Sequence, residues 1–382
     1  AVQHVKTLTP EQQGSAAWCE KQIDSAEVAR AVDKLRKTKL HKSCGIDGVT
    51  NWMIVFGADV DVWTEVFAAC WEMKQMPEQW DTARVKYLFK GTGSRFEITN
   101  YRPISLVSCV AKLFTMVWLE RLQKVADRYL VAQQGCGRKH HGALDQALYF
   151  KMLVKEAISK VDDDGEAGAK VYACFTDAAK AYDRVWRDGL YMALFFYGIR
   201  GTMLHMIMLW LDNACAVTMW NGTHGPKVHL EQGVRQGCSM SPLFYELFLN
   251  VFVGRVPPEA VPVEFVDLRE EFFSQGLAKV EAQWGDLVGE PMSAGVYDEK
   301  LKLWVSNLLF MDDTVLLGAS EAEVQVLLDS YVAFCKAFRI NLNAKKTKVL
   351  VFSADGKQGP HKKWTTALGD VAMVESGATT QP

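Results

Sequence analysis

The chain has 382 residues, of which 49% are hydrophobic, 23% charged and 11% aromatic. This composition is typical of a globular protein with a large core and excludes a disordered or fibrous chain. The 43 Lys and Arg residues and 45 Asp and Glu residues give a net charge of −2. That balance excludes a nucleic-acid binder that is basic over its whole surface but allows a locally basic one.

The nine cysteines are scattered without a CxxC pair, and the histidines are not clustered. This pattern favours reduced, intracellular thiols over a disulfide framework or a zinc site. The longest apolar stretch, Leu190–Ile199, is too short to cross a bilayer, so we expect no membrane partner. Because the chain starts at Ala1 rather than Met, we expect it to be part of a longer polyprotein or a truncated reading frame.

Hydrophobic periodicity predicts the elements of the chain. In chain order, helices are expected at Ser25–Leu35 (capped by Ser25), Asp59–Trp71, Ile104–Leu130, Asp145–Ser159, Trp186–Tyr197, Thr202–Trp210, Pro242–Val253 and Ser320–Phe338. Strands are expected at Arg84–Phe89, Val171–Phe175, Val217–Trp220, Val228–Leu230, Lys302–Phe310, Thr314–Leu317 and Lys348–Phe352. The irregular order of helices and strands favours an α+β fold over a doubly wound parallel sheet. Pro257–Pro291 is expected to be an insertion loop.

Acidic residues follow apolar runs at two places. Asp177 ends one predicted strand, and Asp312 and Asp313 lie between two others, 135 residues further on. Each acid could serve only a turn or a helix cap. Two adjacent carboxylates between apolar strands nevertheless repel each other unless a cation neutralises them. Hard divalent ions take oxygen ligands, so the pattern predicts a Mg²⁺ site.

A third segment, Gln232–Pro242, has the pattern of a loop that leads into a helix. Gly233 and Gly237 are expected to let the backbone approach a bound ligand, and Gln236 offers amide donors. Alone, this segment could be an ordinary loop. Together, a strand-end acid and a pair of hairpin acids are what two-metal phosphoryl transfer requires.

These three segments resemble, in the expected order, the A, B and C motifs of reverse transcriptases. The chain resembles in particular the reverse transcriptase domain of non-LTR (LINE-type) retrotransposons, with group II intron reverse transcriptases as more distant relatives. The resemblance covers roughly residues 40 to 353. Four further segments resemble motifs of that family: Lys42–Gly48, Asn100–Leu106, Gln134–Arg138 and Asn341–Lys348.

The resemblance implies a right-hand polymerase fold with a palm and fingers and with the thumb largely missing. The expected segments are a helical N-terminal extension at 1–79, fingers at 80–170, a palm at 171–353 with an insertion at about 256–297, and a polar tail or the start of a truncated thumb at 354–382. The implied enzyme is an RNA-directed DNA polymerase that binds an RNA template, a DNA primer, dNTPs and two Mg²⁺ ions. The implied localisation is intracellular, nuclear and cytoplasmic, and the oligomeric state stays open.

The resemblance also implies roles for single residues. Asp177, Asp312 and Asp313 match the catalytic, metal-binding acids. Tyr182 matches the position that packs under the incoming sugar and excludes a 2′-OH, although it could be a core aromatic. The remaining matches are Gln236 and Gly237 at the nucleotide and template, and Arg102 and Lys90 at the triphosphate, although surface cations are often merely solvated. Further cations expected near nucleic acid are Arg84, Lys86, Arg95, Arg102, Arg138, Lys139, Lys345, Lys346 and Lys348.

One catalytic position departs from the family pattern, because Met311 stands where alanine is usual. The rival interpretations are a domesticated or decayed relative that binds nucleic acid without catalysis, a group II intron-type enzyme, an RNA-templated RNA polymerase and a nuclease. The intact acids argue against decay, and Tyr182 disfavours an RNA polymerase. A nuclease would not need the loop around Gln236.

Overall fold

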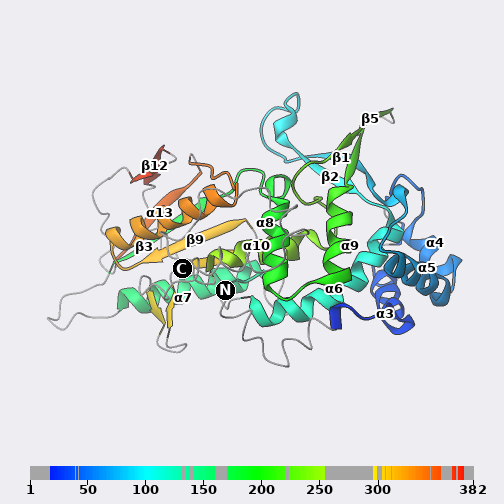
Figure 1. The fold of residues 1–382 in the computed structure, drawn as a ribbon. Helices are drawn as coiled ribbons and strands as arrows, with labels where there is room; N and C mark the ends of the chain where they lie inside the picture. The colour runs from blue at the N-terminus through cyan, green and yellow to red at the C-terminus, as the bar shows by residue number, and fades with distance from the viewer. Residues whose placement is uncertain are drawn as a thin grey trace. The chain divides into compact units, whose positions relative to one another are not determined.

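The computed structural model describes most of the chain (Figure 1). The described residues are 18–38, 40–41, 43–130, 134–136, 142–159, 170–220, 223–253, 296–298, 303–305, 307–310, 312–344, 346–353, 364–366 and 369–373. The predictions for Pro257–Pro291, Arg138, Lys139, Met311 and Lys345 lie outside these ranges. The chain forms two compact units: the first contains the described parts of 130–181 and 248–382, and the second those of 4–129 and 182–247.

A six-stranded sheet forms the centre of the first unit, with strand order β11-β12-β10-β3-β9-β8. Neighbouring strands are antiparallel except for β10 and β12, which are parallel. The strands are β3 (Val171–Asp177), β8 (Asn307–Phe310), β9 (Asp313–Gly318), β10 (Lys348–Phe352), β11 (Trp364–Thr366) and β12 (Gly369–Met373). A separate two-stranded sheet pairs β6 (Val296–Asp298) with β7 (Leu303–Val305).

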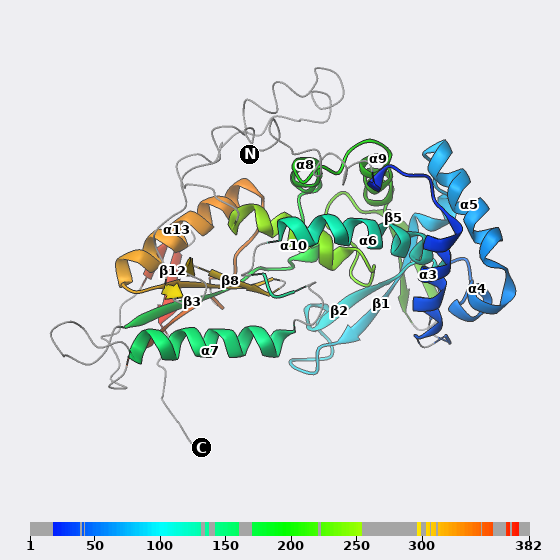
Figure 2. The same cartoon turned by 90° about the horizontal axis from the view of Figure 1, so that it is seen from below.

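Helices cover both faces of the six-stranded sheet. Figure 2 shows α7 (Ala143–Ser159) on one face and α13 (Glu321–Ala337) on the other. One core cluster consists of Leu153, Val154, Val171, Ala173, Leu308 and Leu317. The buried face of α13 has helical spacing and includes Val324, Leu327, Leu328 and Tyr331. Because β3 is covered on both faces, its sequence is almost continuously apolar rather than alternating.

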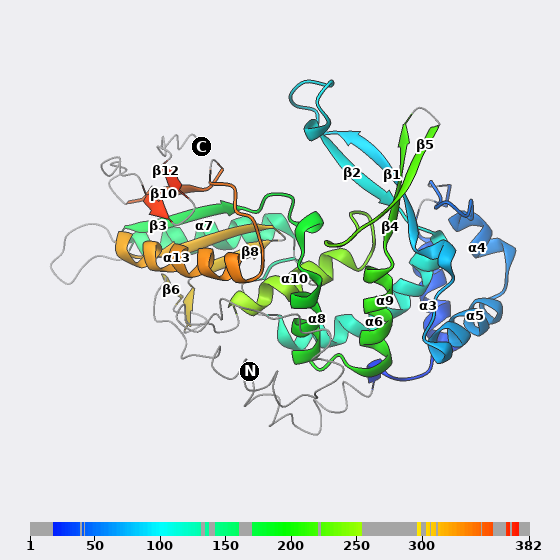
Figure 3. The same cartoon turned by 45° about the horizontal axis from the view of Figure 1, so that its top comes forward.

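The second unit contains a four-stranded sheet in the order β2-β1-β4-β5. The two outer pairs are antiparallel hairpins, and β1 and β4 join them in parallel. Figure 3 shows both hairpins extending away from the helices of this unit. The strands are β1 (Thr82–Phe89), β2 (Tyr101–Leu106), β4 (Cys215–Trp220) and β5 (Thr223–His229).

Large aromatic side chains form part of the core of the second unit. Phe114 stacks on Phe67 with 4.7 Å between ring centroids and meets Trp118 edge-on at 4.6 Å. Trp80 contacts the same cluster. The helices are α3 (Ser25–Arg36), α4 (Asn51–Gly57), α5 (Val60–Met73), α6 (Cys109–Tyr129), α8 (Arg187–Phe196), α9 (Gly201–Asp212) and the start of α10 (Ser241–Val253).

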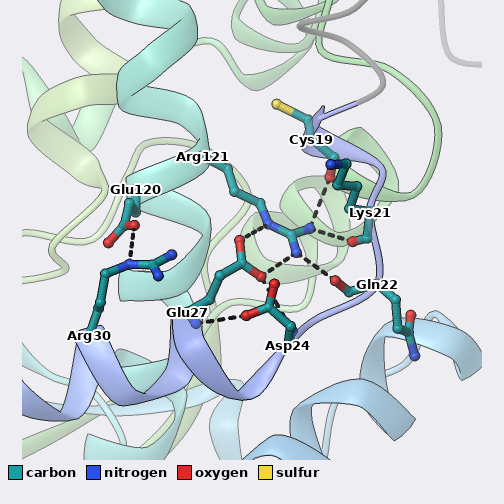
Figure 4. Close-up of polar contacts among 8 residues, drawn as sticks. All are labelled: Cys19, Lys21, Gln22, Asp24, Glu27, Arg30, Glu120 and Arg121. Atoms are coloured by element: carbon teal, nitrogen blue, oxygen red, sulfur yellow. Dashed lines mark hydrogen bonds and ion pairs between the residues drawn. The ribbon is translucent and has the colours of Figure 1, made fainter.

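A buried arginine fastens the segment before α3 to α6 (Figure 4). Arg121, 1% exposed, donates from Nε and Nη2 to the two carboxylate oxygens of Glu27, at 2.8 and 2.6 Å. Its terminal nitrogens also donate to the carbonyls of Cys19, Lys21 and Gln22. The planar guanidinium is suited to this task because its donors form a rigid fork.

Two predictions about local structure are wrong. The helix predicted at Ile104–Leu130 starts too early, because Ile104–Leu106 belongs to the strand β2. β2 is an edge strand, where Pro103 costs no ladder hydrogen bond. The helix begins only at Cys109, where Ser108 Oγ accepts from the amide of Ala111. The N-cap of α3 is Asp24 rather than Ser25, because its carboxylate accepts from the amide of Glu27.

The structure also contains elements that the sequence did not predict. These are the short helix α4, whose N-cap Thr50 accepts from the amide of Met53, and the strands β11 and β12 within the segment predicted to be polar. All nine cysteines are unpaired. None of the described helices has the length and apolar character needed to span a membrane.

Candidate active site

The first unit brings the predicted acids to one end of its sheet. Asp177 is the last residue of β3, and Asp313 is the first residue of β9. The two face each other as cross-strand partners, and Asp312 lies in the turn between β8 and β9. Opposite residues of antiparallel strands have neighbouring side chains. Two segments 135 residues apart therefore place their carboxylates together.

The acids repel one another, and a lysine partly compensates. Desolvation raises the pKa of Asp313, the charges of Asp312 and Asp177 raise it further, and the Lys346 ammonium lowers it. Lys346 Nζ lies 3.2 Å from one carboxylate oxygen of Asp177 and 3.1 Å from the other. The segment before Lys346 is held against the end of β3, because Asn343 donates its amide to the carbonyl of Asp177.

The chemistry of these groups fits a hard divalent cation. All three side chains offer carboxylate oxygens, and their mutual repulsion is relieved by positive charge. In the part of the chain that the structure describes, no three His, Cys, Asp or Glu side chains are already arranged around one point as ligands. The ammonium of Lys346 supplies the positive charge at Asp177 instead.

The second unit contains the loop Gln232–Cys238, which we call the glycine loop. Gly233 and Gly237 have positive φ values of 82° and 110°. A Cβ on Gly233 would lie 2.5 Å from the carbonyl oxygen of Asp183, and one on Gly237 would lie 2.7 Å from that of Ser105. The two glycines were expected to admit a ligand. Within this unit, the space beside each glycine is instead occupied by backbone atoms of the same chain.

Tyr182 and Gln236 are connected through this loop. The carbonyl of Tyr182 accepts from the amide of Val234 at 2.8 Å, and Gln236 Nε2 donates to Asp183 Oδ1 at 3.0 Å. The ring of Tyr182 is half-buried and stacks on Tyr245, with centroids 5.3 Å apart. Asp183 thereby orients the side chain of Gln236.

The predicted phosphate-binding cations lie on the β1–β2 hairpin. Arg102 is exposed on β2 and is the cross-strand partner of Leu88. Lys90 is also exposed, and its Nζ donates to the carbonyl of Thr99. The register places Lys86, Leu88 and Lys90 on the same face as Arg102, because alternate residues of a strand share a face. Arg84, also predicted as a cation for nucleic acid, instead donates to the carbonyls of Cys44 and Gly45.

A family model described as reverse transcriptase (RNA-dependent DNA polymerase) matches residues 90–369, well over half of the chain. The chain belongs to the reverse transcriptase family. The match confirms the family resemblance seen in the sequence, and it includes Asp177, Asp312, Asp313 and the glycine loop.

Curated relatives of this reverse transcriptase are polymerases of mobile elements. "Probable RNA-directed DNA polymerase from transposon BS" of Drosophila melanogaster is 28% identical over 236 residues, covering 59% of this chain and 24% of the relative. "Retrovirus-related Pol polyprotein from type-1 retrotransposable element R2" of Popillia japonica is 24% identical over 283 residues, covering 74% of this chain and 34% of the relative. The chain thus spans about a quarter to a third of the length of these relatives.

A solved structure is also similar. The apo telomerase of Candida tropicalis, truncated from its C-terminal domain, matches with a TM-score of 0.44 and 14% identity, over 82% of this chain and 59% of that one.

The sequence analysis predicted no specific role for two residues of this reverse transcriptase, one in each unit. Lys346 was grouped with cations for nucleic acid, whereas it pairs with Asp177. Arg235 was not singled out, although it is buried directly beside Gln236. The sequence offered one indication of this role: Arg235 is a charged residue between two glycines, Gly233 and Gly237, and directly follows the apolar Val234. Charged residues are rarely buried unless they have partners.

Proposed function

We propose that this chain carries the polymerising part of an RNA-directed DNA polymerase of a non-LTR mobile element. It adds dNTPs to the 3′ end of a DNA primer on an RNA template. The observation that supports this best is the cross-strand pairing of Asp177 with Asp313, with Asp312 beside it. Phosphoryl transfer needs such a concentration of carboxylates, and a structural turn does not.

The same proposal assigns Mg²⁺ to the carboxylates. Asp177, Asp312 and Asp313 would hold the ions, which when bound activate the primer hydroxyl and stabilise the leaving pyrophosphate. Lys346 forms an ion pair with Asp177 and so lowers the negative charge at these carboxylates. Because the Lys346 side chain is 64% exposed, this ion pair is weak and easily exchanged.

The right-hand description belongs to the proposal as well. Residues 171–353, with β3 and the β8–β9 hairpin, would be the palm, and 80–170, with the β1–β2 hairpin, the fingers. The N-terminal 1–79 would be a helical extension. RNA template, DNA primer and dNTPs are the partners, and the nucleus and cytoplasm are the proposed places of action.

Primer extension by the purified chain tests the proposal. An RNA template, a labelled DNA primer, dNTPs and Mg²⁺ should give extended product, and Asp177→Asn or Asp312→Asn should abolish it while retaining the fold. Asp127→Asn, which removes an exposed acid of α6, is the matched control and should extend normally. Extension by Asp312→Asn at the wild-type rate would refute the metal-ligand role. Incorporation of rNTPs in preference to dNTPs would indicate an RNA polymerase, and template–primer binding without extension would indicate a decayed relative.

A further inference from the structure

A buried arginine lies immediately before the nucleotide-contacting residues proposed in the glycine loop. Arg235 is 3% exposed, and its guanidinium lies 4.3 Å from the ring centroid of Trp210. Nη2 donates to the carbonyl of Asp81 at 2.6 Å and Nη1 to that of Trp80 at 3.4 Å, while Nε has no partner. The side chain therefore connects the loop to the residues just before β1.

The backbone around Arg235 is held from several sides within the same unit. Its own carbonyl accepts from Ser241 Oγ at 2.8 Å, and the carbonyl of Gln236 accepts from the amide of Ser105 on β2 at 2.7 Å. A second buried arginine, Arg187, donates from Nε to the carbonyl of Gly233 at 3.0 Å and from Nη2 to that of Gln232 at 3.2 Å. Two guanidinium groups thus fix the glycine loop through main-chain carbonyls.

We propose that Arg235 is a positioning residue for nucleotide selection: it fixes the glycine loop so that Gln236 and Tyr182 are held in place before a nucleotide binds. The proposal rests on the polymerase function proposed above. Arg235 acts on both residues through the backbone. Gln236 directly follows it in the chain, and the amide of the preceding residue, Val234, donates to the carbonyl of Tyr182. It does not itself touch the substrate.

The energetics of the site support a positioning role. Burying a cation is costly, and a surface residue in the same loop would avoid that cost. Burial lowers the pKa of Arg235 to about 10, so the guanidinium stays charged at neutral pH and its hydrogen bonds remain charge-assisted. A lysine could bond only as a point charge and could not span two carbonyls in one plane.

Steady-state incorporation kinetics with the full chain test this role. Arg235→Met should raise KM for the dNTP about tenfold and leave kcat within about twofold, because the loop is preformed in the wild type and must order upon binding in the variant. The ratio of kcat/KM for dNTP to that for rNTP should fall, since Tyr182 is no longer held by Val234. Arg235→Lys should recover part of both losses.

Arg121 provides the matched control. It is an equally buried arginine of the same unit that also donates to main-chain carbonyls, but its contacts lie at the segment before α3. Arg121→Met should lower the melting temperature without changing KM or the sugar ratio. If Arg235→Met changes only the melting temperature, as Arg121→Met does, the positioning role is refuted.

Amide hydrogen exchange separates this proposal from the polymerase function. Arg235→Met should accelerate exchange at Gly233 and Val234, whose amides are bonded in the wild type, and Arg121→Met should not. If the wild type is inactive but the variants show this exchange pattern, the polymerase assignment is wrong. The conclusion that Arg235 fixes the glycine loop would still stand. Unchanged exchange at both amides would overturn the proposal whatever the activity.

Discussion

At the scale of single residues, Tyr182 illustrates how one side chain can serve packing and selectivity together. Its half-buried ring stacks on the buried Tyr245, so its position is fixed by the core of its unit. A ring with a fixed position can exclude a 2′-OH by volume alone, which a mobile ring could not do. The packing contact therefore supports, rather than opposes, the proposed selection of deoxynucleotides.

Replacing Tyr182 by valine should admit rNTPs while dNTP incorporation is largely retained. The measurement is the ratio of kcat/KM for dNTP to that for rNTP, because specificity is a difference in transition-state binding. Tyr182→Phe keeps the ring and should keep the ratio. If Tyr182 is only a core aromatic, its truncation to alanine would cost about 3–5 kcal/mol and lower both rates together. An unchanged ratio in Tyr182→Val would remove the selectivity role.

The buried carboxylate of Asp81 leads to a second prediction at this scale, that the stability of the protein depends on pH. Asp81 is 8% exposed, its Oδ1 has no partner, and desolvation raises its pKa to about 6 against the attraction of Arg235. The folded state therefore favours the protonated acid. Its contribution to stability is complete below about pH 4 and is lost as the pH rises through 6. The loss amounts to about 3 kcal/mol, at 1.36 kcal/mol for each pKa unit.

Asp81→Asn should remove this pH dependence. The difference in unfolding free energy between variant and wild type should shift in favour of the variant between pH 4 and pH 7, measured by denaturant titration at each pH. Asp61→Asn, at an exposed position in the first turn of α5, is the control and should give a nearly constant difference. A constant difference for Asp81→Asn as well would contradict the raised pKa.

At the scale of elements, the Arg121 network makes the segment before α3 an integral part of its unit. Arg121→Met should cost about 3–5 kcal/mol, because it leaves Glu27, which is 6% exposed, as an unpaired buried charge. Denaturant unfolding measures the loss. The double variant with Glu27→Gln should recover much of it. The neighbouring pair Arg30–Glu120 is partly exposed, so Arg30→Gln should cost less than about 1 kcal/mol. Equal losses in the two single variants would contradict this assignment.

The elements differ in how well the sequence predicted them. The long periodic helices and the apolar strand β3 were predicted because one face or both faces are buried in a regular pattern. β2 was predicted wrongly, because Pro103 after a break suits the first turn of a helix as well as an edge strand, and only pairing with β1 decides between them. That pairing depends on residues elsewhere in the chain, which local periodicity does not contain.

At the scale of the whole molecule, the candidate catalytic residues were predicted better than the residues that position them. Acids at strand ends have a local signature, and the structure places Asp177 and Asp313 opposite each other. The contacts of Lys346 with Asp177, and of Arg235 with the carbonyls before β1, join distant segments. No spacing rule indicates such contacts. The predicted boundaries between extension, fingers and palm stay a prediction.

The net charge of −2 means that attraction to nucleic acid must be local. The exposed face of the β1–β2 hairpin carries Lys86, Lys90 and Arg102. If these three cations contact phosphates, the triple glutamine variant should weaken template–primer binding. It should also reduce the slope of log K against log salt concentration by about 2 to 3, since each neutralised phosphate contributes roughly 0.7 to 0.9. Fluorescence anisotropy over a salt series measures both quantities.

The matched control changes the net charge equally at exposed lysines of other elements. Lys37, Lys155 and Lys336 lie at the end of α3, on α7 and on α13, and all three are exposed. Their triple glutamine variant should leave the salt slope nearly unchanged, because counterions are released only where cations meet phosphates. Equal slopes for the two triple variants would show that overall charge, and not the hairpin face, attracts the nucleic acid. The hairpin would then lose its assignment as the fingers surface that binds phosphates.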